Sequence, residues 1–359
     1  MTDLEKILIQ LANAFGPSGF EKDVRDIFRQ EVAGCAEIDY DHLGSIIAKH
    51  YGSSTTPRIL LAAHLDEVGL MVRGILPNGY LKVAPLGGWW APALVAQRVV
   101  IRSQNNQDHY GVMGAKPPHF MSDDEKNRAL KLSDLYIDLG ARNAEEVAAL
   151  GIQVGDPVVP AVQAGALSPP GALAGKAFDD RAGCAAVIKI LQELDTSHPN
   201  LVIGAGTVQE ENGIKGAITL ASMVHPDLCI ILEGAPADDF PDAGPIKQGQ
   251  LGAGPQIRYF DPSMIANQSL AKFAAAAAEK LGISYQVAVR EVGSTDGREI
   301  QTSGNGVPCV VIGIPVRYAH SHQGILSLQD LHSTVQLVKA LLYELDQTTV
   351  NELKRNPWR

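Results

Sequence analysis

The chain has 359 residues, of which 45% are hydrophobic and 19% are charged, and its formal net charge is −10. This length is sufficient for two domains, or for one large domain that carries an insertion. The excess of acidic residues argues against a nucleic-acid surface, which would need clustered Lys and Arg side chains. No apolar run approaches the roughly 18 residues that are needed to span a bilayer.

Two features of the sequence indicate its compartment. The N-terminal segment MTDLEKILIQLANAF has neither a basic n-region nor a small-residue cleavage site, so we predict an amphipathic helix of the mature protein and no signal peptide. The cysteines lack C-x-x-C spacing, and three of them lie in apolar stretches, which predicts free buried thiols in a reducing cytoplasm. They are Cys35, Cys184, Cys229 and Cys309.

The predicted secondary structure changes in character near residue 68. Ser18-Gly-Phe-Glu21 has the pattern of a capping box and predicts a second helix that extends to about Glu31. The apolar run Arg58–Ala63 predicts a strand that is covered on both faces. Residues 68–162 then contain short β-like runs with frequent Gly and Pro, which predicts a small β-rich domain inserted into a larger one.

The remaining chain alternates regularly between strands and helices. Such alternation predicts an α/β fold, a mixed sheet with helices on both faces, in which ligands bind at the carboxyl ends of strands. We assign residues 1–67 and 163–359 to a catalytic α/β domain and residues 68–162 to the inserted domain. Strands are predicted at 201–208, 228–232 and 307–315, and helices at 180–194, 214–223, 269–281 and 327–345.

Four of the predicted strands end in a side chain that can bind a metal ion. A charged group beside a buried strand is costly to desolvate unless it is paired or bound to a cation. Two imidazoles with several carboxylates suit Zn²⁺ or Co²⁺ better than Mg²⁺ or Ca²⁺, which prefer oxygen ligands. The side chains at the four strand ends are His64 with Asp66 and Glu67, Glu210 with Glu211, Glu233, and His320, and Asp179 before a helix is a fifth candidate.

The adjacent acids Glu210 and Glu211 raise a geometric question, because successive side chains of a strand point to opposite faces. Both can face one site only if strand geometry ends near Gln209. One carboxylate would then bind metal, and the other would be free to act as the general base on a bridging water. A solvated turn with two surface acids is the alternative hypothesis.

Asp66 lies two residues beyond His64, on the same side of an extended chain. A carboxylate in that position would fix the tautomer of a metal-bound imidazole. We therefore expect Asp66 to support His64 and not to bind metal itself.

Five segments carry a resemblance to a known family. They are HLDE (64–67), KAFDDR (176–181), QEENG (209–213), LEGAPADD (232–239) and RYAHS (317–321). In this order and spacing they resemble the tetrahedral aminopeptidases, dinuclear metallopeptidases that include glutamyl, leucyl, lysyl and deblocking enzymes. The resemblance covers almost the whole chain, and it includes GPSGFE (16–21), GVMGAKPPH (111–119) and STDG (294–297).

The resemblance implies a centre of two divalent ions, Zn²⁺ or Co²⁺. Asp179, preferred to its neighbour Asp180, would bridge the ions. Glu210 would be the catalytic base, and Asp66 would orient His64. The implied ligands are His64, Asp179 and Glu233 for one ion, and Asp179, Glu211 and His320 for the other.

Two positions depart from the family pattern. The position of Glu233 is commonly Asp in the family, so its longer side chain could change the preferred metal. His322 follows the RYAHS segment where the family often has Pro, which leaves a third imidazole near the site.

The resemblance also implies an architecture and an assembly. The family fold is a zinc-peptidase-like α/β domain interrupted by a small β-rich, PDZ-like domain. Its members form homo-oligomers, hollow tetrahedral dodecamers built from dimers, and the inserted domain shares in assembly and gating. Trp89 and Trp90 would lie either at such an interface or in the core of the insert.

The predicted function is a cytoplasmic metallo-aminopeptidase that removes N-terminal residues from short peptides. A catalytically inactive peptide-binding or scaffold protein is one alternative. A glycosidase with paired carboxylates is another alternative, but that reaction would not use His64 or His320. Gly204-Ala-Gly206 is a poor dinucleotide-binding motif, because a third glycine and a following helix are missing.

The sequence does not decide which N-terminal residue of the peptide substrate is preferred. A pocket for acidic side chains would need a nearby cation. Spacing alone does not choose among Arg181, Arg258, Arg290 and Arg317.

Overall fold

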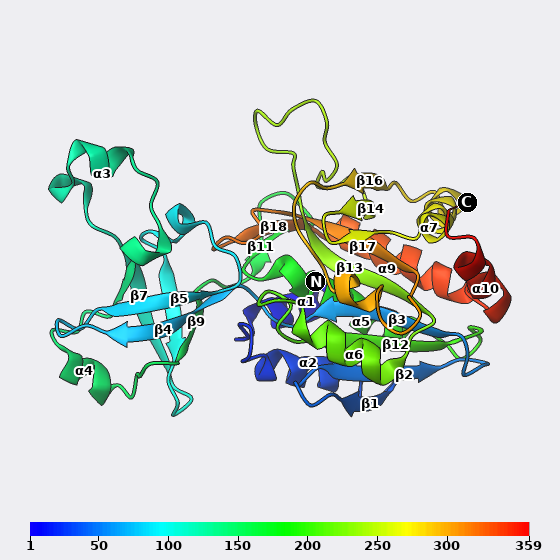
Figure 1. The fold of residues 1–359 in the computed structure, drawn as a ribbon, viewed down its shortest axis with the longest axis horizontal. Helices are drawn as coiled ribbons and strands as arrows, with labels where there is room; N and C mark the ends of the chain where they lie inside the picture. The colour runs from blue at the N-terminus through cyan, green and yellow to red at the C-terminus, as the bar shows by residue number, and fades with distance from the viewer. Residues whose placement is uncertain (359) are drawn as a thin grey trace.

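The computed structural model describes residues 1–358 and contains a large α/β part and a smaller barrel beside it (Figure 1). The large part is built on a 12-stranded mixed sheet. Its centre consists of four parallel strands in the order β12, β3, β13 and β17. These strands are β12 (Leu201–Thr207), β3 (Arg58–His64), β13 (Leu228–Pro236) and β17 (Cys309–Arg317).

The central strands are buried on both faces, which explains their continuous apolar sequences. The predicted strand at 58–63 is thereby confirmed. Antiparallel strands continue the sheet on both sides. The outer strands are β1 (Glu37–Tyr40), β2 (Ile46–Tyr51), β10 (Gly165–Ala166), β11 (Ala172–Gly175), β14 (Gln256–Asp261), β15 (Met264–Ile265), β16 (Gln286–Val289) and β18 (Gly324–Ser327).

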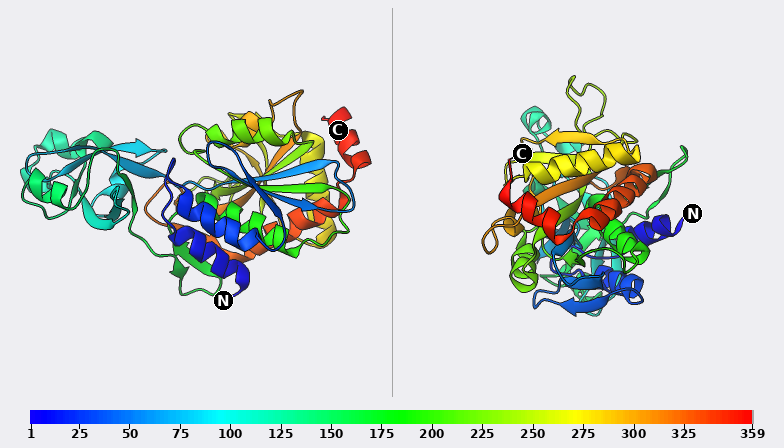
Figure 2. Two further views of the ribbon diagram at one scale, coloured as in Figure 1. Left: turned by 90° about the horizontal axis from the view of Figure 1, so that it is seen from below. Right: turned by 90° about the vertical axis from the view of Figure 1, so that its right-hand side faces the viewer.

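Helices cover both faces of the sheet, as predicted (Figure 2). One face carries α5, which packs on β3 and β13 and also contacts α1, α2 and α9. The other face carries α6 and α8, while α7 packs against β14 and α9. The helices are α1 (Asp3–Asn13), α2 (Lys22–Val32), α5 (Phe178–Glu193), α6 (Lys215–Val224), α7 (Gln268–Leu281), α8 (Gly297–Ile300), α9 (Leu328–Glu344) and α10 (Gln347–Arg355).

The predicted capping box before α2 is wrong. The helix begins at Lys22, and its N-cap residue Glu21 makes no side-chain hydrogen bond to the helix. The Ser18 hydroxyl and the Glu21 carboxylate are instead turned inward, where they bind groups far away in the sequence. A capping box does occur at α1, where Thr2 and Glu5 exchange side-chain and backbone hydrogen bonds.

The smaller part is a closed barrel with strand order β4-β5-β8-β7-β6-β9 and a hydrophobic core of its own. Trp89 packs partly buried against this core and donates to the carbonyl of Gly69 at 2.8 Å, whereas Trp90 is 71% exposed. Core packing therefore holds for Trp89, and an interface role for the exposed Trp90 stays a prediction. The predicted domain limits at 68 and 162 stay a prediction.

The barrel strands are β4 (Gly69–Ile75), β5 (Leu81–Leu86), β6 (Arg98–Arg102), β7 (Asp108–Gly114), β8 (Tyr136–Asp138) and β9 (Pro157–Pro160). Short helices connect them. They are η1 (Ala91–Leu94), η2 (Pro118–Phe120), α3 (Asp123–Asn127), η3 (Leu132–Asp134) and α4 (Ala144–Ala149).

The cysteines are free, as predicted, and three of them are buried. They form no disulfide, and Cys35 is the half-buried one. In the described part of the chain, no helix has the length and apolar character to cross a membrane.

A buried ion cluster ties the N-terminal segment to the sheet and to α5. The Glu67 carboxylate lies 2.6 Å from Lys176 Nζ and 3.3 Å from Arg181 Nη2, and all three side chains are almost fully buried. Lys176 also donates to the carbonyl of Ala14, and Arg181 donates to those of Leu11 and Gly16. The cluster therefore holds the loop after α1 against the carboxyl end of β3.

Replacing Glu67 by Gln should destabilise the fold strongly, because two buried cations would lose their carboxylate partner. Breaking a buried pair in this way typically costs about 3–5 kcal/mol. Urea denaturation followed by circular dichroism measures the change in the apparent free energy of unfolding. Asp123→Asn, which breaks an exposed pair with Lys126, is the control and should cause little change. Equal losses of unfolding free energy in the two variants would contradict the stabilising role assigned to the buried ion cluster.

Candidate metal centre

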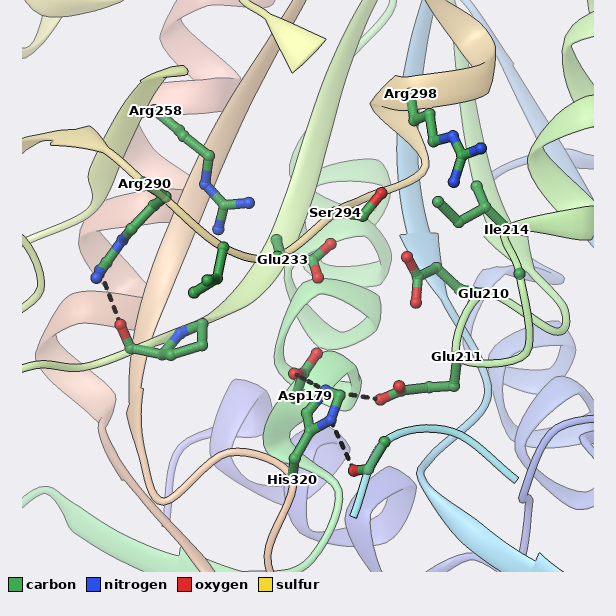
Figure 3. Close-up of a pocket in the computed structure, with 15 residues that line it drawn as sticks. Asp179, Glu210, Glu211, Ile214, Glu233, Arg258, Arg290, Ser294, Arg298 and His320 are labelled. Carbon is green, nitrogen blue, oxygen red and sulfur yellow. Dashed lines mark hydrogen bonds and ion pairs between the residues drawn. The ribbon is translucent and has the colours of Figure 1, made fainter. Parts of the chain in front are cut away.

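A cavity of about 370 Å³ opens where the parallel strands of the sheet end (Figure 3). Its lining comes from the carboxyl end of β13, the turn after β12, the start of α5 and the loop after β17. Ligands bind to open α/β sheets at this edge. The cavity therefore lies where the sequence placed the candidate ligands.

Asp179 lies between two imidazoles. Its Oδ1 is 3.2 Å from His64 Nε2, and its Oδ2 is 3.4 Å from His320 Nε2. Figure 3 shows His320 approaching Asp179 from one side, with Glu211 next to it. One carboxylate thus faces both histidines through its two different oxygens.

Each histidine also faces a glutamate. Glu211 Oε1 is 3.3 Å from His320 Nε2, and Glu233 Oε1 is 3.9 Å from His64 Nε2. The five predicted ligands therefore form two groups that share Asp179. We call this set, His64, Asp179, Glu211, Glu233 and His320, the ligand cluster.

The other ring nitrogen of each histidine meets a backbone carbonyl. His64 Nδ1 lies 3.1 Å from the carbonyl of Asp66, and His320 Nδ1 lies 3.0 Å from that of Gly88 in the barrel part. A carbonyl accepts, so each Nδ1 is the donor and Nε2 of a neutral ring carries the lone pair. In both rings that lone pair faces carboxylate oxygens, an arrangement that requires a proton or a cation between them.

Asp180 is fully buried, and backbone amides surround its carboxylate. Its carboxylate accepts from the amides of His64 at 3.0 Å, and of Gly183 and Gly234 at 2.9 Å each. Oxygens of Asp180 and Glu233 do come within 4.8 Å of each other and of a His64 ring nitrogen. However, the structure brings Asp179, and not Asp180, between the two imidazoles.

The turn after β12 resolves how two adjacent acids share one site. Strand β12 ends at Thr207, and Gln209 adopts a left-handed conformation with φ of 56°. The amides of Glu210 and Glu211 then both donate to the Asp66 carboxylate, at 3.0 and 3.1 Å. Both glutamate side chains line the cavity and are almost fully buried, which excludes the solvated turn.

Asp66 has a wider set of contacts than the sequence suggested. Its carbonyl, not its carboxylate, is the nearer acceptor to His64 Nδ1, since Oδ1 lies 3.5 Å away. The carboxylate accepts from the Ser18 hydroxyl at 2.5 Å and from the two amides of the turn. Asp66 therefore contacts both His64 and the segment that carries Glu210.

Sequence reasoning missed three residues that surround the ligand cluster. Ser18 contacts Asp66, and Glu21 accepts from the amide of Gln209 at 3.0 Å. Asp296 is buried and accepts from the Thr207 hydroxyl at 2.5 Å. Ser18 and Glu21 were interpreted as a helix cap, and the segment STDG, which contains Asp296, entered only through the family resemblance.

His322 does not line the cavity. It is buried, and burial lowers its pKa to about 4. Its Nδ1 has no hydrogen-bond partner within residues 1–358. The third imidazole is therefore a neutral buried group and not a member of the ligand cluster.

The carboxylates of the site are strongly perturbed. Burial raises the pKa of Glu210 and of Glu233 well above the usual range, and it raises the pKa of Glu211 to about 7. Burial also opposes ionisation of Asp179, but hydrogen bonds from His320 and His64 outweigh it and hold its pKa below the usual value. Throughout the described chain, no Lys or Arg forms an ion pair with the ligand cluster.

Comparison with known proteins agrees with this geometry. Residues 44–337 match the family described as M42 glutamyl aminopeptidase. The chain is 34% identical over 344 residues to the glutamyl aminopeptidase of Lactococcus lactis, covering 94% of this chain and 95% of that protein.

Solved structures show the same fold over nearly the whole chain. The TET aminopeptidase of the marine sediment archaeon Thaumarchaeota archaeon SCGC AB-539-E09 has a TM-score of 0.94 and 39% identity, with 98% of both chains covered. The Pyrococcus horikoshii TET1 peptidase, described as assembling into a tetrahedron or a large octahedral shell, has a TM-score of 0.85 and 32% identity, covering 96% of this chain and all of that one, 100%. With a family match over most of its length and relatives this similar, the chain belongs to the M42 glutamyl aminopeptidase family and is a peptidase.

Proposed function

We propose that this peptidase is an aminopeptidase that uses two divalent metal ions and a glutamate base to remove N-terminal residues from short peptides. The observation that carries the proposal is the ligand cluster, in which two His–Glu groups share the two oxygens of Asp179. The family supports metal dependence, and the geometry supports the finer assignment.

The donor set fits a pair of borderline cations. Two imidazole nitrogens and three carboxylates suit Zn²⁺ or Co²⁺. One ion would be held by His64, Asp179 and Glu233, and the other by Asp179, Glu211 and His320. When bound, such ions polarise a carbonyl oxygen and lower the pKa of a water molecule that they share. Their charge would also relieve the crowding of buried acids that have no Lys or Arg partner.

Glu210 is placed to move the proton. It lines the cavity beside Glu211 but belongs to neither His–Glu group. Burial raises its pKa well above that of an ordinary glutamate, and the nearby charge of Glu211 adds to this effect. A carboxyl group with a raised pKa can accept a proton from the attacking water and deliver it to the departing amine.

Glu21 and Asp66 position the segment that carries this base. Glu21 accepts from the amide of Gln209, and Asp66 accepts from the amides of Glu210 and Glu211. Three consecutive amides are therefore fixed by two buried carboxylates. We propose that these contacts hold the Glu210 carboxylate at a constant distance from the reacting water.

The proposed assembly is a homo-oligomer, a tetrahedral dodecamer built from dimers. The described tetrahedral form of the Pyrococcus horikoshii relative supports it. Exposed aromatic side chains of the barrel part, Trp90 and Phe120, offer apolar contact area. The free buried cysteines fit the proposed cytoplasmic location.

Replacing Glu210 by Gln should abolish turnover and keep both metal ions, because the amide cannot accept the proton and Glu210 is not a proposed ligand. Loss of a general base typically lowers kcat by about 10²–10⁴-fold. Hydrolysis of aminoacyl p-nitroanilides and metal analysis by mass spectrometry measure the two effects separately. Activity close to that of the wild type would show that Glu210 is not the base.

Replacing Asp179 by Asn should lower metal binding to less than one tightly bound ion per chain, since both ions share this carboxylate. Asp123→Asn is the control, because it removes an exposed carboxylate of the barrel part that is paired with Lys126, and it should keep both ions. Equilibrium dialysis with Zn²⁺ measures the stoichiometry. A wild-type chain that binds fewer than one ion, or that hydrolyses peptides after chelation, would contradict a dinuclear enzyme.

Replacing Glu21 by Leu should lower kcat with little change in KM, because the amide of Gln209 loses its acceptor and Glu210 shifts. A displacement of about 1 Å can cost roughly 100-fold in rate. Glu21→Gln, which keeps an acceptor oxygen, should recover most of the activity. If both variants are equally impaired at full metal content, the hydrogen bond is not what positions the base.

A further inference from the structure

His320 differs from other members of the ligand cluster in what holds it. His64 and Glu233 lie on the central strands β3 and β13, and their side chains are 2% and 9% exposed. His320 lies on the loop between β17 and β18, and its side chain is 41% exposed. Its φ of 58° is left-handed, as is the φ of 60° at Tyr318. Residues other than glycine keep such conformations where surrounding contacts fix them, so the contacts of this loop decide where His320 lies.

Two contacts of this loop come from the barrel part. The Gly88 carbonyl, just after β5, faces His320 Nδ1 at 3.0 Å. The ring of His322, which is buried, forms a hydrogen bond with the backbone of Arg98 at the start of β6. The Ser321 hydroxyl between them contacts carbonyls of the loop itself. The loop is therefore fastened to the barrel at His320 and again at His322.

The barrel part also packs against the carboxylate beside His320. A Cβ atom added to Gly87 would lie 3.1 Å from Glu211 Oε2, and one added to Gly88 would lie 3.3 Å from His320 Nδ1. Gly87 has a φ of +83°, a conformation that glycine adopts without strain. Glu211 and His320 lie side by side in the cavity (Figure 3). Two residues without side chains thus form a close wall of the barrel against both groups.

His64 and Glu233 are held from within the α/β part. The Nδ1 atom of His64 lies 3.1 Å from the carbonyl of Asp66, and its amide donates to Asp180. Glu233 belongs to β13, which is paired in parallel with β17 at this position. The two His–Glu groups of the ligand cluster are therefore shaped by different parts of the molecule.

We propose that the barrel part completes the ion site formed by Glu211 and His320 with Asp179, whereas the site formed by His64 and Glu233 does not depend on it. The placement of the barrel against the α/β part then sets the affinity of one ion and not of the other. Because coupling between binding and placement is reciprocal, an ion held by Glu211 and His320 also fastens the barrel. This inference rests on the proposed dinuclear function.

Replacing Gly88 by Ala tests the contact with His320. The added Cβ atom crowds Nδ1 and displaces the ring from its carbonyl acceptor. The affinity for one Zn²⁺ ion should fall by roughly 10–100-fold, as is typical when a group that orients a ligand is disturbed, and the other ion should keep its affinity. Competition with a chromophoric chelator measures both affinities and needs no catalytic activity.

Gly74→Ala is the matched control. It adds the same methyl group to strand β4 of the barrel, where the new Cβ atom meets no atom within 4 Å. Both zinc affinities should equal those of the wild type. A loss of affinity equal to that in Gly88→Ala would overturn the assignment to the contact with His320.

Combined variants identify which ion is affected. In a Glu233→Gln background, the tighter remaining site is that of Glu211 and His320, so Gly88→Ala should weaken it. In a His320→Asn background, the tighter remaining site is that of His64 and Glu233, so Gly88→Ala should change nothing. Equal losses in the two backgrounds, or a loss in the His320→Asn background alone, would overturn the inference.

His322→Leu tests the second attachment of the loop. Leucine fills much of the buried space but cannot form the hydrogen bond with the backbone of Arg98, so the same ion should be weakened. Thermal melting followed by circular dichroism shows whether the variant is folded. Zinc affinities that are unchanged in both His322→Leu and Gly88→Ala would overturn the inference and leave the proposed function intact.

The same measurements separate failure of the inference from failure of the function. A wild type that binds two ions with the expected variant pattern, but hydrolyses no peptide, would refute the aminopeptidase function and support the role of the barrel. A wild type that binds a single ion, weakened by Gly88→Ala, would refute the dinuclear function, while the contribution of the barrel to that site would stand.

Discussion

The desolvation of clustered acids is the constraint on which this structure depends. Carboxylates from separate segments converge where the parallel strands end, and burial raises the pKa of most of them. Isolated buried carboxylates are strongly unfavourable, so such a cluster persists only where amides, imidazoles or cations compensate it. Among the acids of the ligand cluster together with Asp66, Glu67 and Glu210, only Glu67 has Lys and Arg partners in the described chain. We propose that metal ions compensate the charge of the ligand cluster.

Adjacent acids are used in three different ways around this centre. Asp66 accepts from the turn above it, while Glu67 pairs with cations beneath it, as alternating side chains do. Asp179 faces the two histidines, while Asp180 binds amides of β3, α5 and β13. Glu210 and Glu211 both face the cavity because the chain has left strand geometry. Buried carboxylates thus fix the backbone as well as provide the chemistry.

The sequence predicted the central strands and the candidate ligands at their ends because both leave local signals, whereas the choice of Asp179 and Glu211 as ligands came from the family resemblance. Buried parallel strands are continuous apolar runs, and a charged residue at the end of such a run is conspicuous. The roles of Ser18 and Glu21 were not predictable, because the same spacing fits a helix cap. The left-handed conformation of Gln209 was not predictable either, because glycine usually occupies such positions and Gln209 is not a glycine. The position of Arg258 and Arg290 at the cavity needed tertiary structure, since β14 and β16 are brought near β13 only by the sheet.

Different parts of the sheet supply the acidic and the basic lining of the cavity. The ligand cluster stands at the ends of the central parallel strands and on α5, where any backbone shift would move several ligands together. Arg258 and Arg290 belong to β14 and its parallel neighbour β16, and β14 joins the central sheet through an antiparallel contact with β17. Neither of these outer strands carries a member of the ligand cluster. The charge on this side of the cavity is therefore set by strands other than those that fix the geometry of the ligand cluster.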